Sequence, residues 1–404
     1  MANTLLNPTI ITREALRILH QEMNFISTIN RQYDDRFANS GASPSGKIGP
    51  SLAIRMPNRF TVRSGAVLNV QDVAEESQTL TVSTQKGVDF KFPCTDLTLT
   101  IDAFVERYLR PAMSVLAAIV EADAISMYKD VYNIVDGDTV AFDFVHLTTA
   151  QEIMNDELAP RNMRYALLKN KHVNKFLVAA KGLFNPQSDI GSQYRRGVLG
   201  NIADYDVMAS THLTNHTTGS AAKSTGYLTD IAGGEANGSA GLLHIDTGST
   251  TFKKGDIVTI TDTNRVHPET KASTGTLQKF VVTADFAGGE GDLAISPNVI
   301  TSGAKQNVDA IADGKAVVKV GAGANELLDM SLAYHRDAFT FVSADLEDVS
   351  KYGAWGAREV MDGISMRIAR QYDITNDQVP CRIDVLYGFK TIRPELACRI
   401  HADG

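Results

Sequence analysis

The 404-residue sequence is poor in cysteine and tryptophan and contains no long apolar run. Its three cysteines, Cys94, Cys381 and Cys398, are odd in number and far apart, which favours free thiols in a reducing compartment over a disulfide framework. No segment approaches the roughly 18 consecutive apolar residues of a membrane span, and the N-terminal region lacks the apolar core of a secretion signal. We therefore expect a cytoplasmic product without a membrane partner.

Positive charge is also scarce. The 39 lysine and arginine residues against 47 aspartate and glutamate residues give a net charge of −8. Nucleic-acid binding through many phosphates requires a basic excess on one surface, so this balance argues against a protein that wraps DNA or RNA. With 43% hydrophobic and 21% charged residues, the composition is that of a globular protein of two or three domains.

Catalytic motifs are missing as well. The segment Gly41–Lys47 has the glycine and lysine spacing of a phosphate-binding loop, but Ile48 follows where a metal-binding hydroxyl is required. His212 and His216 have helical spacing but no further metal ligands beside them, so we interpret them as part of a solvent-facing linker. Cys94 has no histidine near it in sequence to activate it. The sequence predicts no enzyme, and no catalytic, cofactor or metal site.

The longest helical pattern runs from Phe104 to Tyr132. Apolar residues recur at steps of three and four along one face, which is typical of a buried helix surface: Met113, Leu116, Ala117, Val120, Ala124, Met127, Tyr128 and Val131. A second apolar face carries Val115, Ile119, Ala122 and Ile125. Two such faces predict a helix packed from two sides, either as an ordinary core helix or as a spine for separate lobes.

A helix capped by Thr12 and a glycine- and serine-rich connector at residues 39–49 precede a long hairpin. The hairpin's central part, residues 57–78, has few large apolar side chains, and an isolated hairpin is only marginally stable in water. We therefore expect it to rest on something other than itself, which includes the possibility that it reaches over an adjacent subunit. Alternation with a period of two predicts its strands at residues 52–55, 79–83 and 88–92.

Charges in this hairpin are sorted by limb. The candidate subunit-interface residues are three arginines on the outgoing limb and three acids near the tip and return: Arg55, Arg59, Arg63, Asp72, Glu75 and Glu76. These charges can pair within the hairpin. The alternative, which we favour, is that the arginines of one subunit face the acids of its neighbour.

Residues 214–328 differ in composition from the rest of the chain. Sixteen of the 31 glycines lie between Gly219 and Gly323, and short strand-like segments alternate with turn residues, which predicts an inserted small β-barrel or sandwich. Mixed α/β sequence surrounds this insertion. Helices are expected at residues 144–158 and 170–180, and strands at 165–168, 206–210, 338–343, 363–368, 382–389 and 395–401.

Several stretches, taken in order, resemble the major capsid (coat) proteins of tailed bacteriophages, in particular the short-tailed Salmonella lambdoid podovirus type. They include NTLLNPTIITREALRILH from residue 3, IRMPNRFTVRSGAVLNVQD from residue 54, DLTLTIDAFVERYLRPAM from residue 96, FKKGDIVTI from residue 252 and RIDVLYGFKTIRPELACRI from residue 382. The resemblance implies the HK97-like capsid fold, an α+β architecture with an inserted all-β barrel. The implied parts are an N-terminal arm and connector (1–49), an extended loop (50–94), a peripheral domain with the spine helix (95–132), an axial domain (133–213 and 329–404, whose last strand returns to the peripheral domain) and the inserted barrel (214–328).

The resemblance also implies a function. Pentamers and hexamers of the chain would form an icosahedral shell, assembled as a procapsid around a scaffolding protein, joined by a portal protein, and enclosing double-stranded DNA without sequence-specific binding. The protein would be made in the bacterial host cytoplasm and end in the virion capsid, without a cofactor. Two alternatives are an encapsulin-like compartment of the same fold that holds cargo enzymes, and a hydrolase with a β accessory domain.

Overall fold

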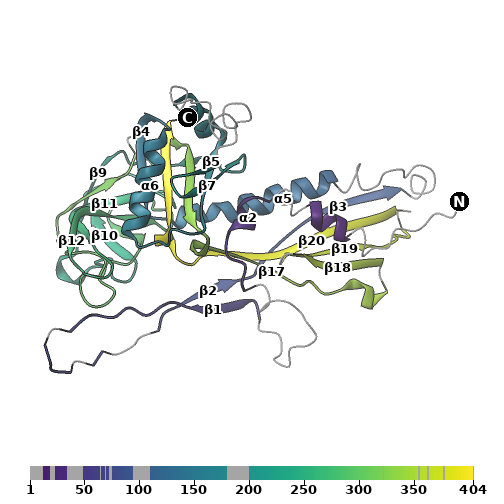
Figure 1. The fold of residues 1–404 in the computed structure, drawn as a ribbon, viewed down its shortest axis with the longest axis horizontal. Helices are drawn as coiled ribbons and strands as arrows, with labels where there is room; N and C mark the ends of the chain where they lie inside the picture. The colour runs from purple at the N-terminus through teal and green to yellow at the C-terminus, as the bar shows by residue number, and fades with distance from the viewer. Residues whose placement is uncertain are drawn as a thin grey trace. The chain divides into compact units, whose positions relative to one another are not determined.

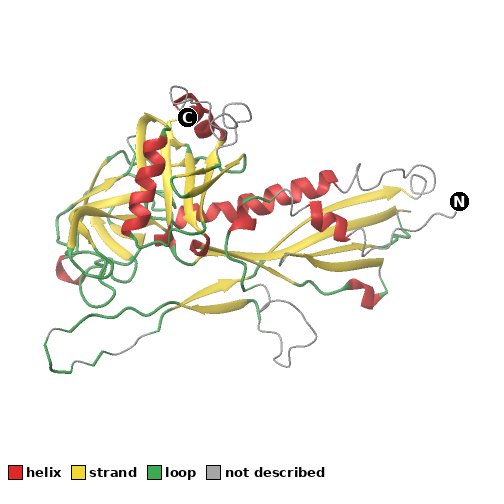
Figure 2. Ribbon diagram, viewed as in Figure 1, coloured by secondary structure: helices red, strands yellow, loops and turns green. Residues whose placement is uncertain are grey.

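The structure is a computed structural model. It describes residues 12–18, 23–33, 49–63, 65–68, 70–71, 75–93, 110–179, 200–321, 323–353, 355–361, 364–375 and 378–403. The chain divides into two compact units. Unit 1 contains residues 1–55, 77–125 and 339–390, and unit 2 contains residues 56–76, 126–338 and 391–404. Both combine helices with sheets, so the expected α+β class is confirmed (Figure 2).

Unit 1 is built on a sheet of long antiparallel strands (Figure 1). The order is β17-β20-β19-β18, and β3 pairs with β20 over ten residue pairs, from Gln378↔Pro93 to Tyr387↔Thr84. These strands are β3 (Thr84–Pro93), β17 (Phe339–Ala344), β18 (Trp355–Met361), β19 (Ile364–Arg370) and β20 (Gln378–Thr391). The strands expected at residues 338–343, 363–368 and 382–389 are thus confirmed, with bounds shifted by one or two residues in β17 and β19 and wider at both ends in β20.

The strands expected at residues 52–55 and 79–83 form the ladder of the hairpin, with bounds shifted by one or two residues, but the third expected strand does not belong to it. Its ladder consists of β1 (Ser51–Arg55) and β2 (Ser77–Thr81), paired in five positions from Ser51↔Thr81 to Arg55↔Ser77. The alternating segment at residues 88–92 is a strand, as expected, but it lies in β3 and pairs with β20 rather than with the hairpin. Alternation determines which side chains share a face, but it does not determine the partner strand.

The spine helix α5 (Arg110–Ile125) continues directly into the 3₁₀ helix η2 (Ser126–Asp130). Its expected start, residues 104–109, lies outside the described residues. The first apolar face is buried as predicted, and the short helix α2 (Phe25–Thr28) packs against it. The buried carboxylate of Glu121 accepts hydrogen bonds from the backbone N–H groups of Asn24 (3.2 Å) and Phe25 (2.9 Å).

The second apolar face of α5 contradicts the prediction of packing from two sides. Val115 is 56% exposed and Ile119 is 42% exposed, whereas Ile125 is buried. By length and apolar composition alone, Arg110–Asp130 is the one described helix that could cross a membrane, and half of its most apolar window is buried inside the protein. Its buried Glu121 is bonded to the backbone at Asn24 and Phe25, as in a core helix of a globular protein.

Unit 2 contains a six-stranded mixed sheet in the order β4-β21-β16-β5-β7-β6 (Figure 1). Helices α6 (Phe144–Asp156) and α7 (Asn170–Ala179) match the two expected helices, and Asp143 caps α6 with its side chain. The strands are β4 (Ile134–Ala141), β5 (Arg164–Lys169), β6 (Asn201–Ile202), β7 (Tyr205–Ser210), β16 (Met330–His335) and β21 (Ala397–Asp403). They include the strands expected at residues 165–168 and 206–210, although the middle of β7 is partly exposed. The strand expected at 395–401 begins later, at Ala397, because Pro394–Leu396 form a 3₁₀ helix.

Unit 2 also contains a closed barrel in the order β10-β13-β12-β11-β14-β9. Its strands are β9 (Ser224–Thr229), β10 (Leu242–Asp246), β11 (Ile257–Val266), β12 (Ser273–Val282), β13 (Gly291–Ser296) and β14 (Ala316–Lys319). Alternate residues of these strands point inward and form a buried core that includes Leu243, Ile260 and Phe280. Next to the barrel in sequence, β8 (His216–Thr217) pairs with β15 (Leu327–Leu328). The two ends of the barrel segment therefore lie side by side, as an inserted module requires.

Candidate assembly surfaces

The loop between β1 and β2 exposes apolar side chains to solvent. Five of its members are more than half exposed: Phe60, Val62, Val67, Leu68 and Val70. Val62 is 98% exposed. Two hydrogen bonds connect the outgoing and returning segments of the loop. The Gln71 side chain accepts one from Thr61 N (2.9 Å) and donates one to Thr61 O (2.5 Å). Such an exposed apolar surface is typical of a protein–protein interaction site.

The predicted interface residues lie along this loop and its base. Arg55 is on β1, and Arg59, Arg63 and Glu75 are exposed in the loop. Asp72 lies outside the described residues. The Arg63 guanidinium donates to the carbonyls of nearby loop residues, and Arg59 makes no hydrogen bond or ion pair with any residue that the structure describes.

Glu76 pairs with a residue outside the hairpin. Its carboxylate forms an ion pair with the Lys305 ammonium, a residue of the segment between β13 and β14. Both side chains are partly exposed, so the pair contributes less than about 1 kcal/mol. The structure therefore pairs Glu76 with Lys305 and not with an arginine of the same hairpin.

A second, better buried ion pair fastens the barrel to helix α6. Arg265 of β11 lies 3.3 Å from Glu157 and donates a 2.6 Å hydrogen bond to the carbonyl of Asp156. Burial raises the pKa of Glu157 to about 7, while the positive charges of Arg265 and Arg59 act in the opposite direction. Glu157 is thus a buried carboxylate that forms an ion pair with Arg265, while the loop residue Arg59 acts on it only as a more distant positive charge.

The connection into the barrel contains a buried polar network, which corrects the interpretation of His212 and His216 as a solvent-facing linker. His216 is buried, and its Nε2 lies 2.8 Å from Asp256 Oδ1. Asp256 also accepts hydrogen bonds from the backbone N–H groups of Gly219 (3.0 Å) and Lys253 (2.8 Å). The partner residue is 40 positions away in sequence, so no local spacing could reveal this pair.

Arg399 of strand β21 contacts the residue that precedes Asp256. Its side chain is completely buried, and it donates a 2.7 Å hydrogen bond to the carbonyl of Gly255. Burial lowers the pKa of its guanidinium to about 10. Its Nε and Nη2 atoms are buried without a hydrogen-bond partner among the described residues, so the contact with Gly255 offsets only part of the cost of burying this charge.

Cys94 lies outside the described residues, whereas Cys381, Cys398 and Asp384 are buried. Burial raises the pKa of the Cys381 thiol to about 11 and that of Cys398 to about 12, which disfavours the nucleophilic thiolate. Asp384 is buried between Arg367 (2.8 Å) and Arg382 (2.7 Å). Among the described residues, one mixed group of metal-ligating side chains stands apart from these contacts, and it lies on the barrel.

Comparison with solved structures finds phage proteins that share this fold. A chain of Mycobacterium phage Che8 aligns with a TM-score of 0.50 at 12% identity, covering 94% of this chain and 90% of the other. The capsid of cyanophage P-SCSP1u aligns at 0.44 and 10% identity (88% and 84% covered), and the mature capsid of bacteriophage PhiM1 at 0.44 and 12% (88% and 82%). No curated protein sequence matches the chain.

The fold is therefore the HK97-like fold of tailed-phage capsid proteins. A family model described as the P22 coat protein, gene protein 5, matches residues 47–399. The chain belongs to the P22 coat protein family, and it is a major capsid protein with a structural role in the virion shell.

Proposed function

We propose that the chain assembles as pentamers and hexamers into an icosahedral shell, through a procapsid built around a scaffolding protein. A portal protein would occupy one vertex, and double-stranded DNA would fill the shell without sequence-specific contacts. The acidic net charge of −8 suits a container that must not adhere to its contents. The net charge does not distinguish this shell from an encapsulin-like compartment that holds cargo enzymes. Membership of a coat protein family favours the capsid.

The observation that carries this proposal is the exposed loop at residues 56–71. Its five exposed apolar side chains are held on a two-stranded ladder that pairs at only five positions. Burying a valine or leucine side chain contributes about 1.5–3 kcal/mol, so a neighbouring subunit that covers this surface gains substantially from the contact. We propose that the loop lies on an adjacent copy, with Arg55, Arg59 and Arg63 facing Glu75, Glu76 and Asp72 of that copy.

The test is charge reversal in the loop. Arg59→Glu combined with Arg63→Glu should prevent or misdirect assembly while the unassembled subunit keeps its circular dichroism spectrum. Arg59→Lys with Arg63→Lys is the matched control, because it keeps the charge, and it should form particles. Sedimentation and electron microscopy report the outcome. Particles of normal size and yield from the charge-reversed variant would contradict the proposed interface.

We also propose the domain limits that follow from this architecture, with the inserted barrel at residues 214–328 between the two parts of the axial domain. The pairing of β8 with β15 supports these limits, because it joins residues on both sides of the barrel.

A further inference from the structure

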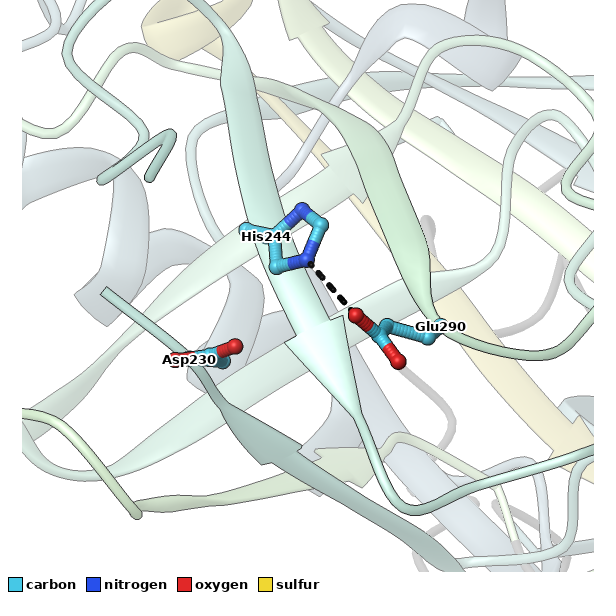
Figure 3. A group of neighbouring side chains, drawn as sticks. All are labelled: Asp230, His244 and Glu290. Carbon is cyan, nitrogen blue, oxygen red and sulfur yellow. Dashed lines mark ion pairs between the residues drawn. The ribbon is translucent and has the colours of Figure 1, made fainter. Parts of the chain in front are cut away.

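One edge of the barrel collects three metal-ligating side chains from separate segments. Asp230 follows β9, His244 lies in β10, and Glu290 lies in the turn before β13. One potential ligand atom from each lies within 4.8 Å of the others, and Figure 3 shows the His244 ring facing the Glu290 carboxylate. The His244 Nε2 to Glu290 Oε1 distance is 3.9 Å.

Strand register brings these residues together. β10 pairs with β9 on one edge and with β13 on the other, so His244 stands opposite Asp292 while Ile245 stands opposite Thr229. The backbone N–H of Asp230 donates a 3.1 Å hydrogen bond to the carbonyl of His244, which fixes the start of the connection after β9. The ladder therefore fixes the position of His244, and it brings the end of β9 and the start of β13, next to which Asp230 and Glu290 lie, to either side of β10.

A fourth residue orients the imidazole. Asp292 Oδ1 lies 2.7 Å from His244 Nδ1, so the neutral ring donates its Nδ1–H to this carboxylate and leaves the Nε2 lone pair toward Glu290. A carboxylate on one ring nitrogen with a metal on the other is the usual support of a metal-bound histidine. Within residues 200–321, all of which the structure describes, neither lysine nor arginine forms an ion pair with Asp230, Glu290 or Asp292.

We propose that Asp230, His244 and Glu290 bind a divalent transition-metal ion of the zinc type, with Asp292 as the positioning residue for His244. One imidazole nitrogen and two carboxylate oxygens suit Zn²⁺ and leave a coordination position for water. Ca²⁺ and Mg²⁺ prefer ligand sets of oxygen alone, so the histidine selects against them. The ion would tie the connection after β9 to β10 and to the turn before β13, and would make this edge of the barrel more rigid.

The competing arrangement is a histidine that stays protonated among the carboxylates. The hydrogen bond to Asp292 raises the pKa of His244, which supports this competition. A metal ion needs the neutral ring, so zinc and a second ring proton compete for His244, and zinc binding should weaken as the pH falls.

The experiment uses the full chain after treatment with a chelator. Zn²⁺ is titrated by calorimetry in two buffers of different ionisation enthalpy, and Co²⁺ is added as a spectroscopic probe. We expect one ion per chain. His244→Ala and Glu290→Gln should each weaken binding at least tenfold, and Asp292→Asn should weaken it by roughly 10–100-fold. Glu290 is 73% exposed, so its substitution leaves folding intact.

His212→Ala is the matched control, because His212 is a partly exposed histidine outside the cluster. It should bind zinc as the wild type does. No binding by the wild-type chain at millimolar zinc would overturn the proposal. Equal affinity of the wild type and His244→Ala would also overturn it, because the ion would then sit elsewhere.

Discussion

Acid should destabilise the sheet of unit 2 through a buried histidine. His172 of α7 is completely buried and stacks on Phe142 at 4.9 Å between ring centroids. Its Nδ1 lies 2.6 Å from Ser331 Oγ, and its Nε2 lies 3.1 Å from the carbonyl of Ala402. The neutral ring satisfies both contacts by donating from Nε2 to the carbonyl and accepting at Nδ1, whereas a second ring proton would force the Ser331 hydroxyl to turn its own proton toward another acceptor.

The magnitude follows from the pKa of this group. Burial lowers the pKa of His172 from 6.5 to about 4, and the nearby charges are Asp329, which opposes the change, and His401 and Lys169, which add to it. The folded state therefore resists protonation, while the unfolded chain binds a proton below pH 6.5. The free energy of unfolding should fall by about 1.4 kcal/mol per pH unit from pH 6.5 to pH 4, or by about 3 kcal/mol in total.

The assay is urea unfolding of the unassembled chain between pH 7 and pH 4, compared with His172→Gln. The variant is less stable at pH 7 but should lack this part of the pH dependence. His146, whose pKa is also lowered by burial, and the carboxylates contribute equally to both proteins and cancel in the difference. His212→Gln serves as the control, with a wild-type pH profile. The reasoning is refuted if His172→Gln and the wild type lose stability in parallel across this range.

Further predictions concern the barrel and the covalent state of the particle. Asp256→Ala leaves His216 and two backbone N–H groups without their acceptor, so it should destabilise the barrel by about 3 kcal/mol in thermal unfolding; an unchanged midpoint would contradict the assigned network. Excised residues 214–328 should fold alone, because the barrel is closed and has its own core, and an NMR spectrum without dispersion would refute this. The extended loop region offers only Lys86 and Lys91 as amines, both in β3, so mature particles should give single-chain bands on denaturing gels rather than covalent ladders.

Local patterns predicted the elements whose signals are local. The helix at 144–156 begins at a capping aspartate and keeps its apolar face buried, and the short strands of the barrel are separated by turn residues that mark their ends. Such patterns could not predict the order of the strands in the barrel and in the two sheets, because this order depends on pairings between distant segments.

The features that the sequence did not predict share one physical cause, which is contact between segments far apart in the chain or with another molecule. The pairing of β3 with β20 joins segments almost 300 residues apart, and the His216–Asp256 pair and the group of Asp230, His244 and Glu290 are also made by strand register. The second face of α5 was misjudged because apolar side chains show only that a surface avoids water. They do not show whether the same chain or another molecule covers it.

The central claim, that this chain is completed by copies of itself through the loop at residues 56–76, is tested most directly by electron cryomicroscopy of the assembled protein. We predict closed hollow particles in which this loop of each subunit lies on a neighbouring subunit and buries Val62, Val67 and Leu68. A chain that remains monomeric in the presence of its scaffolding protein would contradict the claim, as would particles in which the loop contacts only its own subunit.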